Sequence, residues 1–186
     1  MPPQIRVVAS RWTVAILAAL SSIAATGAFA ESNAAPGTAA PMAVSISFFI
    51  DRRLPAELRP SLDAALLKLA DNRCQEVLTD FSDAGGRRLD ENLATLGHSP
   101  TSYLGLVLFY DGRATQACAD RDVLAWTQPG SRAVQICWDQ FAAQQRWDMG
   151  YTANIIIHEA LHTLGLGEGP PDNREITARV AARCGR

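Results

Sequence analysis

The segment from residue 151 to residue 168 places a polar motif directly after an apolar run, and it constrains the fold more than any other part of the chain. Residues 158–168 read His-Glu-Ala-Leu-His-Thr-Leu-Gly-Leu-Gly-Glu, and residues 151–157 before them are largely apolar. Helix positions four apart share a face, so His158 and His162 can bind one metal ion with both imidazoles. The segment therefore predicts a buried helix that carries a metal site.

The residues around the two histidines complete a reactive metal site. The Glu159 carboxylate is rotated around the helix axis, so that it misses the metal but reaches a water on it, where a general base belongs. Gly165 can adopt a positive φ and end the helix, which lets the chain turn back and bring Glu168 to the same ion. We therefore predict that His158, His162 and Glu168 bind one Zn²⁺ per chain.

Other completions of the site remain open at this point. Glu175, on the expected last helix, is a rival third ligand, and Pro170-Pro171 stiffens the path to it. His98 lies in an expected loop and is a fallback ligand. Without a metal, the segment would be a core helix with two hydrogen-bonded histidines and a solvated glutamate.

Over His158, Glu159, His162 and Gly165 the motif resembles the pattern of the metzincin zinc peptidases, His-Glu-x-x-His-x-x-Gly-x-x-His. The chain departs from that pattern because Glu168 replaces the third histidine and no methionine follows Met149 to form the turn beneath the metal. The continuation 164–171, with 175–177 and Cys184, is similar to a group of small secreted bacterial metallopeptidases with metzincin-like helices.

This resemblance implies a zinc-dependent endopeptidase with a peptide or protein substrate, and it implies no substrate sequence. It also implies that Val123–Trp126 is an edge strand above the cleft, where an extended substrate would pair by strand addition; an ordinary hairpin strand is the alternative. A second function is an exported zinc-binding or interaction module without turnover. Such a module would close its site with four protein ligands, whereas the sequence offers three and a glutamate in the base position, which favours the enzyme.

The N-terminus predicts export. Arg6 and Arg11 precede an apolar run, Trp12 to Ala25, which is followed by Ala28-Phe29-Ala30, a small-x-small cleavage signal. We therefore expect a signal peptide over 1–30, cleaved after Ala30, and a secreted or periplasmic protein; a retained membrane anchor is the alternative. Residues 31–42 are rich in Ala, Pro, Gly and Ser, which predicts a flexible leader. Residues 43–186 then form one metallopeptidase-like catalytic domain, with no membrane contact after cleavage.

Charge and cysteine content narrow the class of protein. The formal net charge is −2, and loss of the two arginines with the signal peptide makes it −4. The basic residues form no stripe, so nucleic acid is not an expected partner. The four cysteines of an exported chain predict two disulfides, with Cys118–Cys137 as the first choice and Cys74–Cys184 as the remaining pair. The sequence does not determine an oligomeric state.

The hydropathy pattern predicts an α+β fold. Alternating or continuous apolar runs predict strands at 44–50, 104–110, 122–127 and 133–138, and helical spacing predicts helices at 60–81, 89–96 and 172–183. Residues 139–150 are expected to connect the last strand to the motif helix. The order suits a compact metzincin-like domain, in which helices, including the motif helix, pack on a twisted mixed sheet.

The aromatic residues offer roles that the sequence alone cannot separate. Tyr103, Tyr110 and Tyr151 are candidates for stabilising an oxyanion, although a tyrosine is more often a core or rim residue. The tryptophans expected to pack in the core or line the cleft are Trp126, Trp138 and Trp147. Met149 is expected in the core.

Overall fold

The computed structural model describes residues 46–185, so the interpretation of 1–30 as a signal peptide and of 31–42 as a leader lies outside the described residues. Among the helices of the described part, none is long and apolar enough to cross a membrane. The fold is α+β: helices pack on one mixed sheet, as the hydropathy pattern predicts.

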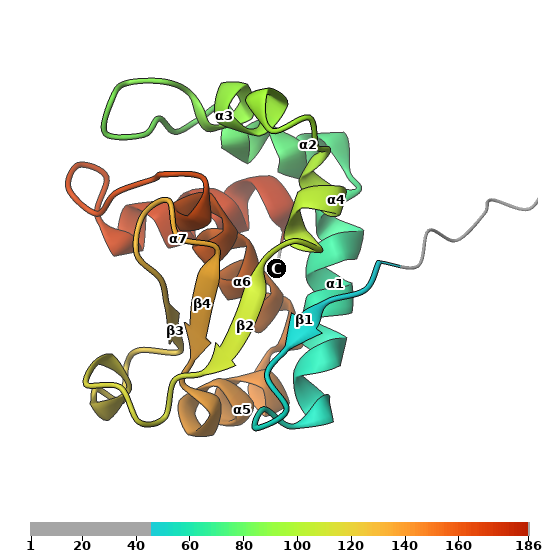
Figure 1. Cartoon of the computed structure of the whole chain (residues 1–186), viewed down its shortest axis with the longest axis vertical. Helices are drawn as coiled ribbons and strands as arrows, with labels where there is room; N and C mark the ends of the chain where they lie inside the picture. Colours follow the sequence, from blue (N-terminus) through green and yellow to red (C-terminus); the bar gives the residue numbers. More distant parts are fainter. Residues whose placement is uncertain (1–45, 186) are drawn as a thin grey trace, which may run out of the picture. The chain divides into compact units, whose positions relative to one another are not determined.

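The sheet contains four short strands in the order β1-β2-β4-β3. β1 (Phe49–Ile50), β2 (Leu108–Asp111) and β4 (Ala133–Ile136) are parallel, and β3 (Ala125–Trp126) runs antiparallel to β4 at the edge. Alternate side chains point to opposite faces of a strand. Phe109, Val134 and Ile136 are fully buried, and they make the face on which the helices pack. Figure 1 shows this sheet in front of the central helix α6.

Two predicted elements are interrupted by local capping. The predicted strand 104–110 starts only at Leu108, because Ser99 caps a short helix α4 (Pro100–Leu104) that occupies its first residue. The predicted helix 60–81 is likewise wrong as a single element. Helix α1 (Arg59–Leu69) ends before Asp71. The Asp71 carboxylate then accepts a hydrogen bond from the backbone N–H of Arg73, and this cap starts α2 (Asn72–Gln75), which is followed by a 3₁₀ turn over Glu76–Leu78. A short polar side chain that bonds its own backbone competes with helix continuation.

The predictions for 139–150 are also wrong. α5 (Trp138–Trp147) occupies this stretch and buries Phe141, so the expected connection is a helix. Trp147 and Met149, predicted to pack or lie in the core, are 89% and 47% exposed because they stand at the corner between α5 and α6. The predicted strands 44–50 and 122–127 shorten to two paired residues each in the described chain. Helices α3 (Leu89–Thr95) and α7 (Asn173–Cys184) confirm the predicted helices 89–96 and 172–183.

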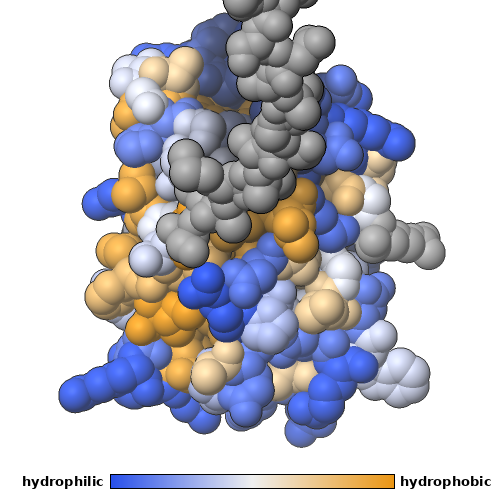
Figure 2. Space-filling view, turned by 90° about the vertical axis from the view of Figure 1, so that its right-hand side faces the viewer, coloured by the Kyte–Doolittle hydropathy of each residue, from blue (hydrophilic) through white to orange (hydrophobic). Residues whose placement is uncertain are grey.

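α6 (Met149–Thr163) is the centre of the described domain, and α1, α5 and α7 pack around it. A small polar link joins α1 to α6: the Ser61 hydroxyl lies 2.8 Å from the Thr152 hydroxyl, and both residues are fully buried. Figure 2 views the side of α1 and β1, where hydrophilic and apolar residues are interspersed. The large apolar side chains exposed on these two elements are Phe49 and Leu67.

Both predicted disulfides are present, Cys74–Cys184 and Cys118–Cys137. The first joins α2 to the C-terminal end of α7, and the second joins a 3₁₀ turn (Ala117–Ala119) to the residue after β4. Two disulfides and no free cysteine in the described chain suggest an oxidising environment.

The two disulfides differ in the loop that each closes, 110 residues for Cys74–Cys184 and 19 for Cys118–Cys137. In the chain-entropy model these loops correspond to about 5 and about 3 kcal/mol of unfolding free energy. We predict that replacing Cys74 and Cys184 together with Ala lowers the midpoint of urea unfolding more than replacing Cys118 and Cys137. Equal or reversed losses in the two double variants would contradict this ranking.

Candidate metal centre

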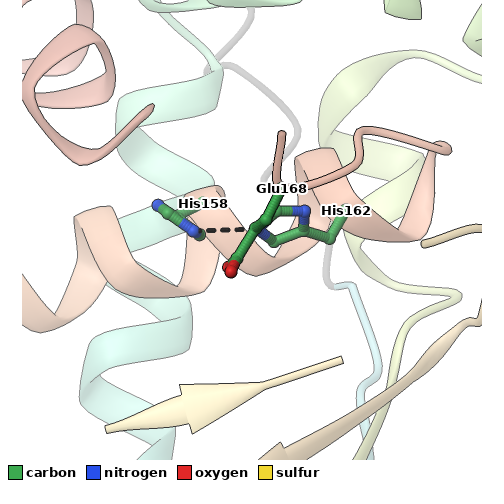
Figure 3. A group of neighbouring side chains, drawn as sticks. All are labelled: His158, His162 and Glu168. Atoms are coloured by element: carbon green, nitrogen blue, oxygen red, sulfur yellow. Dashed lines mark hydrogen bonds and ion pairs between the residues drawn. The ribbon is translucent and has the colours of Figure 1, made fainter. Parts of the chain in front are cut away.

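His158 and His162 stand one turn apart on α6 with their rings turned toward each other. Their Nε2 atoms are 2.9 Å apart, and the residues are only 2% and 3% exposed. The spacing of four residues produces this convergence, as predicted, because both side chains leave the same face of the helix. Figure 3 shows the two imidazoles facing one point beside Glu168.

The far nitrogen of each ring has a hydrogen-bond partner. His162 Nδ1 lies 2.7 Å from the backbone carbonyl oxygen of Leu166, which can only accept, so Nδ1 carries the proton. His158 Nδ1 lies 3.1 Å from the Thr177 hydroxyl on α7. A histidine that donates from Nδ1 has its lone pair on Nε2. When His158 Nδ1 donates to the Thr177 hydroxyl, both Nε2 lone pairs face the same point, which a shared cation would satisfy; when the hydroxyl donates to His158 Nδ1, His158 Nε2 carries the proton and donates to His162 Nε2.

Glu168 reaches the same point from the loop after α6. Gly165 follows the helix with φ +108°, a conformation that L side chains rarely adopt, and its N–H bonds the His162 carbonyl. Leu166 is buried and anchors the turn. The Glu168 carboxylate oxygen Oε1 lies 3.5 Å from His162 Nε2, and ligand atoms of His158, His162 and Glu168 all lie within 4.8 Å of one another.

The rival ligands do not join this group. In residues 46–185, the cluster of three potential ligand side chains is His158, His162 and Glu168. Glu175 is exposed on the first turn of α7, where its backbone N–H bonds the Asp172 cap. His98 is half-buried in the turn before α4 and lies outside the cluster. The group could therefore hold a metal ion through two imidazole nitrogens and one carboxylate oxygen.

Glu159 is 5% exposed, and its Oε2 has no hydrogen-bond partner among the described residues. Burial raises the pKa of Glu159 from 4.5 to about 8, and the negative charge of Glu168 adds to this shift. Burial also lowers the pKa of His158 to about 3, with a further contribution from His162. A buried unpartnered carboxyl beside two neutral imidazoles fits the surroundings of a divalent cation and its water.

Two small hollows lie beside the cluster, along the edge strand β3. One of about 90 Å³ is lined by His158, Glu159, Tyr151 and residues 122–125. The other, of about 170 Å³, is lined by Glu159, His162, Glu168 and residues 125–127. β3 lies at the edge of the sheet and pairs antiparallel with β4, which fits both the predicted edge strand and its alternative, an ordinary hairpin strand. A larger hollow of about 650 Å³ lies over α5 and contains no residue of the cluster.

The aromatic candidates separate by location. Tyr103 is 3% exposed and donates its hydroxyl to Thr163 at 3.0 Å, so it is a core residue. The Tyr110 ring packs against Phe49 on the sheet, with ring centroids 5.6 Å apart. Tyr151 alone of the three lines a hollow beside the cluster. Trp126 lines the second hollow and Trp138 stacks on Phe141, as predicted for cleft-wall and packing residues.

Sequence reasoning missed the residues that hold the site from outside the motif. Asn92 of α3 donates from Nδ2 to the Leu164 carbonyl at 3.0 Å and to Asp83 at 2.9 Å, which holds the end of α6. Asn173 of α7 donates to Glu168 Oε1 at 3.4 Å. Thr177 contacts His158 as described above. Asn92 and Asn173 are polar residues in ordinary helices, and no sequence signal distinguishes them from solvated ones. Thr177 lies in the segment 175–177 that carries the resemblance, but the resemblance did not indicate its contact with His158.

Comparison with family models, with curated proteins and with solved structures found no match to this chain. The assignment of the site therefore depends on its geometry.

The position of Glu168 predicts the metal-binding behaviour of two glutamates. Glu168→Ala removes one of three ligand atoms, so we expect zinc affinity to fall by orders of magnitude in a calorimetric titration. Glu175→Ala is the matched control, and it should bind zinc as the unmodified protein does. The reverse order of effects would show that Glu175, and not Glu168, completes the site.

The raised pKa of Glu159 predicts a pH dependence for the metal-free protein. Above pH 4.5 the unfolded chain releases the Glu159 proton, whereas the folded chain keeps it until about pH 8. Folding therefore becomes less favourable as pH rises through this window. The amide in Glu159→Gln cannot ionise. The unfolding free energy of this variant minus that of the unmodified protein, both measured in chelator, should therefore increase from pH 4.5 to pH 8. If the difference between the two unfolding free energies stays constant across this pH range, the raised pKa of Glu159 is contradicted.

Proposed function

We propose that this protein is an exported zinc-dependent peptidase that hydrolyses peptide bonds with Glu159 as general base. The observation that carries the proposal is the convergence of His158, His162 and Glu168 beside the unpartnered carboxylate oxygen of Glu159. The resemblance of the motif to the metzincins supports the same activity. Glu168 would take the place of the third metzincin histidine.

The donor set favours zinc among the divalent metals. Two imidazole nitrogens and one carboxylate oxygen form an established catalytic zinc environment, and three protein ligands leave one position open. Zinc, when bound, lowers the pKa of a water toward 7 and polarises a carbonyl oxygen. The residues would bind one ion per chain through His158 Nε2, His162 Nε2 and Glu168.

Glu159 supplies the proton transfers in this proposal. Its carboxylate takes a proton from the attacking water and then delivers it to the nitrogen of the leaving amine. The carboxyl is 5% exposed, and the positive charge of a bound zinc ion would favour its ionised form, which is the form that accepts the proton. Ile155, which is buried, lines the same small hollow as Glu159.

The substrate in this proposal is an extended peptide that pairs with β3. The strand lies at the edge of the sheet, and residues 122–127 line both hollows beside the cluster. Main-chain hydrogen bonds to an edge strand give affinity without strict sequence preference. Tyr151, which lines the hollow next to Glu159, is the tyrosine placed to donate to an oxyanion.

The hollow beside His158 and Glu159 is small, about 90 Å³, and leaves little room for a substrate. This favours a second candidate function, an exported zinc-binding module without turnover. The module and the peptidase make the same prediction for zinc binding. They differ in the cleavage of casein or a peptide library with and without chelator.

The general-base role predicts that Glu159→Gln binds about as much metal as the unmodified protein and loses peptide hydrolysis. The loss should be at least ~10²-fold, the lower range for general acid–base catalysis, because the amide cannot accept the proton. Metal content and cleavage rate are measured on the same zinc-loaded sample. Glu175→Gln serves as the control and should retain full rate. Full activity in Glu159→Gln would rule out the mechanism.

A further inference from the structure

One face of α7 contacts two of the three candidate metal ligands, although the helix supplies no ligand itself. Asn173 and Thr177 are four residues apart and therefore share a face. The Thr177 hydroxyl lies 3.1 Å from His158 Nδ1, and Asn173 Nδ2 donates to Glu168 Oε1 at 3.4 Å. That same carboxylate oxygen is the one that faces His162 Nε2.

The two histidines differ in how their rings are oriented. His162 donates from Nδ1 to a backbone carbonyl only four residues away, that of Leu166, so its own turn determines its tautomer. For His158 Nδ1, the hydrogen-bond partner among the described residues is the side chain of Thr177, nineteen residues away. An imidazole without a partner at Nδ1 can carry its proton on Nε2 instead, where it blocks the lone pair that a metal needs.

The C-terminal end of α7 is held in place by several independent links. Cys184 is bonded to Cys74, and Arg183 pairs with both carboxylate oxygens of Asp80 at 2.8 Å. Lys68 of α1 donates to the backbone carbonyls of Cys184 and Gly185. These links involve none of the candidate metal ligands, so they fix the C-terminal end of α7 independently of the metal centre.

We infer that Thr177 and Asn173 are positioning residues of the metal centre, Thr177 for the imidazole of His158 and Asn173 for the carboxylate of Glu168. This inference rests on the metal centre of the proposed function. Partners of this kind, one step removed from the metal, set the tautomer and direction of the ligands. In this chain they come from a helix that the motif itself does not specify.

The test is metal titration of the full chain with Zn²⁺ and with Co²⁺. Thr177→Val removes the hydroxyl at nearly constant volume, and we expect the metal dissociation constant to rise about 10- to 100-fold, the usual effect of losing such a partner. Thr177→Ser keeps the hydroxyl and should restore affinity to near that of the unmodified protein. Asn173→Ala, at an exposed position, should also weaken binding. Thr79→Val is the matched control, because Thr79 is exposed and bonds only a carbonyl in its own turn.

Two further readouts separate positioning from a general loss of structure. The visible absorption bands of the Co²⁺-loaded protein should shift in Thr177→Val and return in Thr177→Ser, because they report ligand geometry. Unchanged affinity and spectrum in both Thr177→Val and Asn173→Ala would overturn the inference. If Thr177→Val does not fold, the inference is judged from the metal affinity and the Co²⁺ spectrum of Asn173→Ala. An unmodified protein that binds neither ion would instead overturn the metal centre and the proposed function with it.

Discussion

The constraint on which the rest of the structure depends is the burial of α6 along nearly its whole length. Every residue from Thr152 to Thr163 is buried, including two histidines, one glutamate and one asparagine. Buried polar groups destabilise a fold unless they find partners, and buried charges do so more strongly. The sheet, α1, α5 and α7 enclose this one helix, and they must satisfy its polar atoms as well as its apolar ones.

Most of these partners come from other elements. Ser61 of α1 bonds Thr152, Tyr103 of α4 bonds Thr163, and Thr177 of α7 bonds His158. Among the polar side chains of α6, the atoms left without a partner in the described structure are Asn154 Oδ1 and Glu159 Oε2. The second lies beside two facing imidazole nitrogens. Glu159 lines both hollows that lie beside the candidate ligands and the edge strand β3, an arrangement that the proposed metal-assisted chemistry would use.

The site shows how far a motif can be followed from sequence. The helical spacing of His158 and His162 was enough to predict their convergence, and Gly165 predicted the turn that brings Glu168 back. Both disulfide pairings were also anticipated. Two predictions failed where a single capping residue decided the outcome: Asp71 divides one long helix, and Ser99 caps α4, which takes Leu104 from the start of a predicted strand. The expected connection over 139–150 is instead the helix α5. The exposure of Trp147 was missed for a related reason, because composition does not reveal where two helices meet at a corner.

The sequence by itself determined the local parts of this protein: the face shared by the two histidines, the reversal after α6 and the approximate positions of β2, β4, α3 and α7. These follow from the 3.6-residue and two-residue periods of the backbone and from the freedom of glycine, which act over a few neighbouring residues. Only the tertiary structure decided which residues support the site from a distance. Thr177, Asn173 and Asn92 reach the site because packing of α7 and α3 brings them there, and such contacts between distant residues leave no periodic trace in the chain.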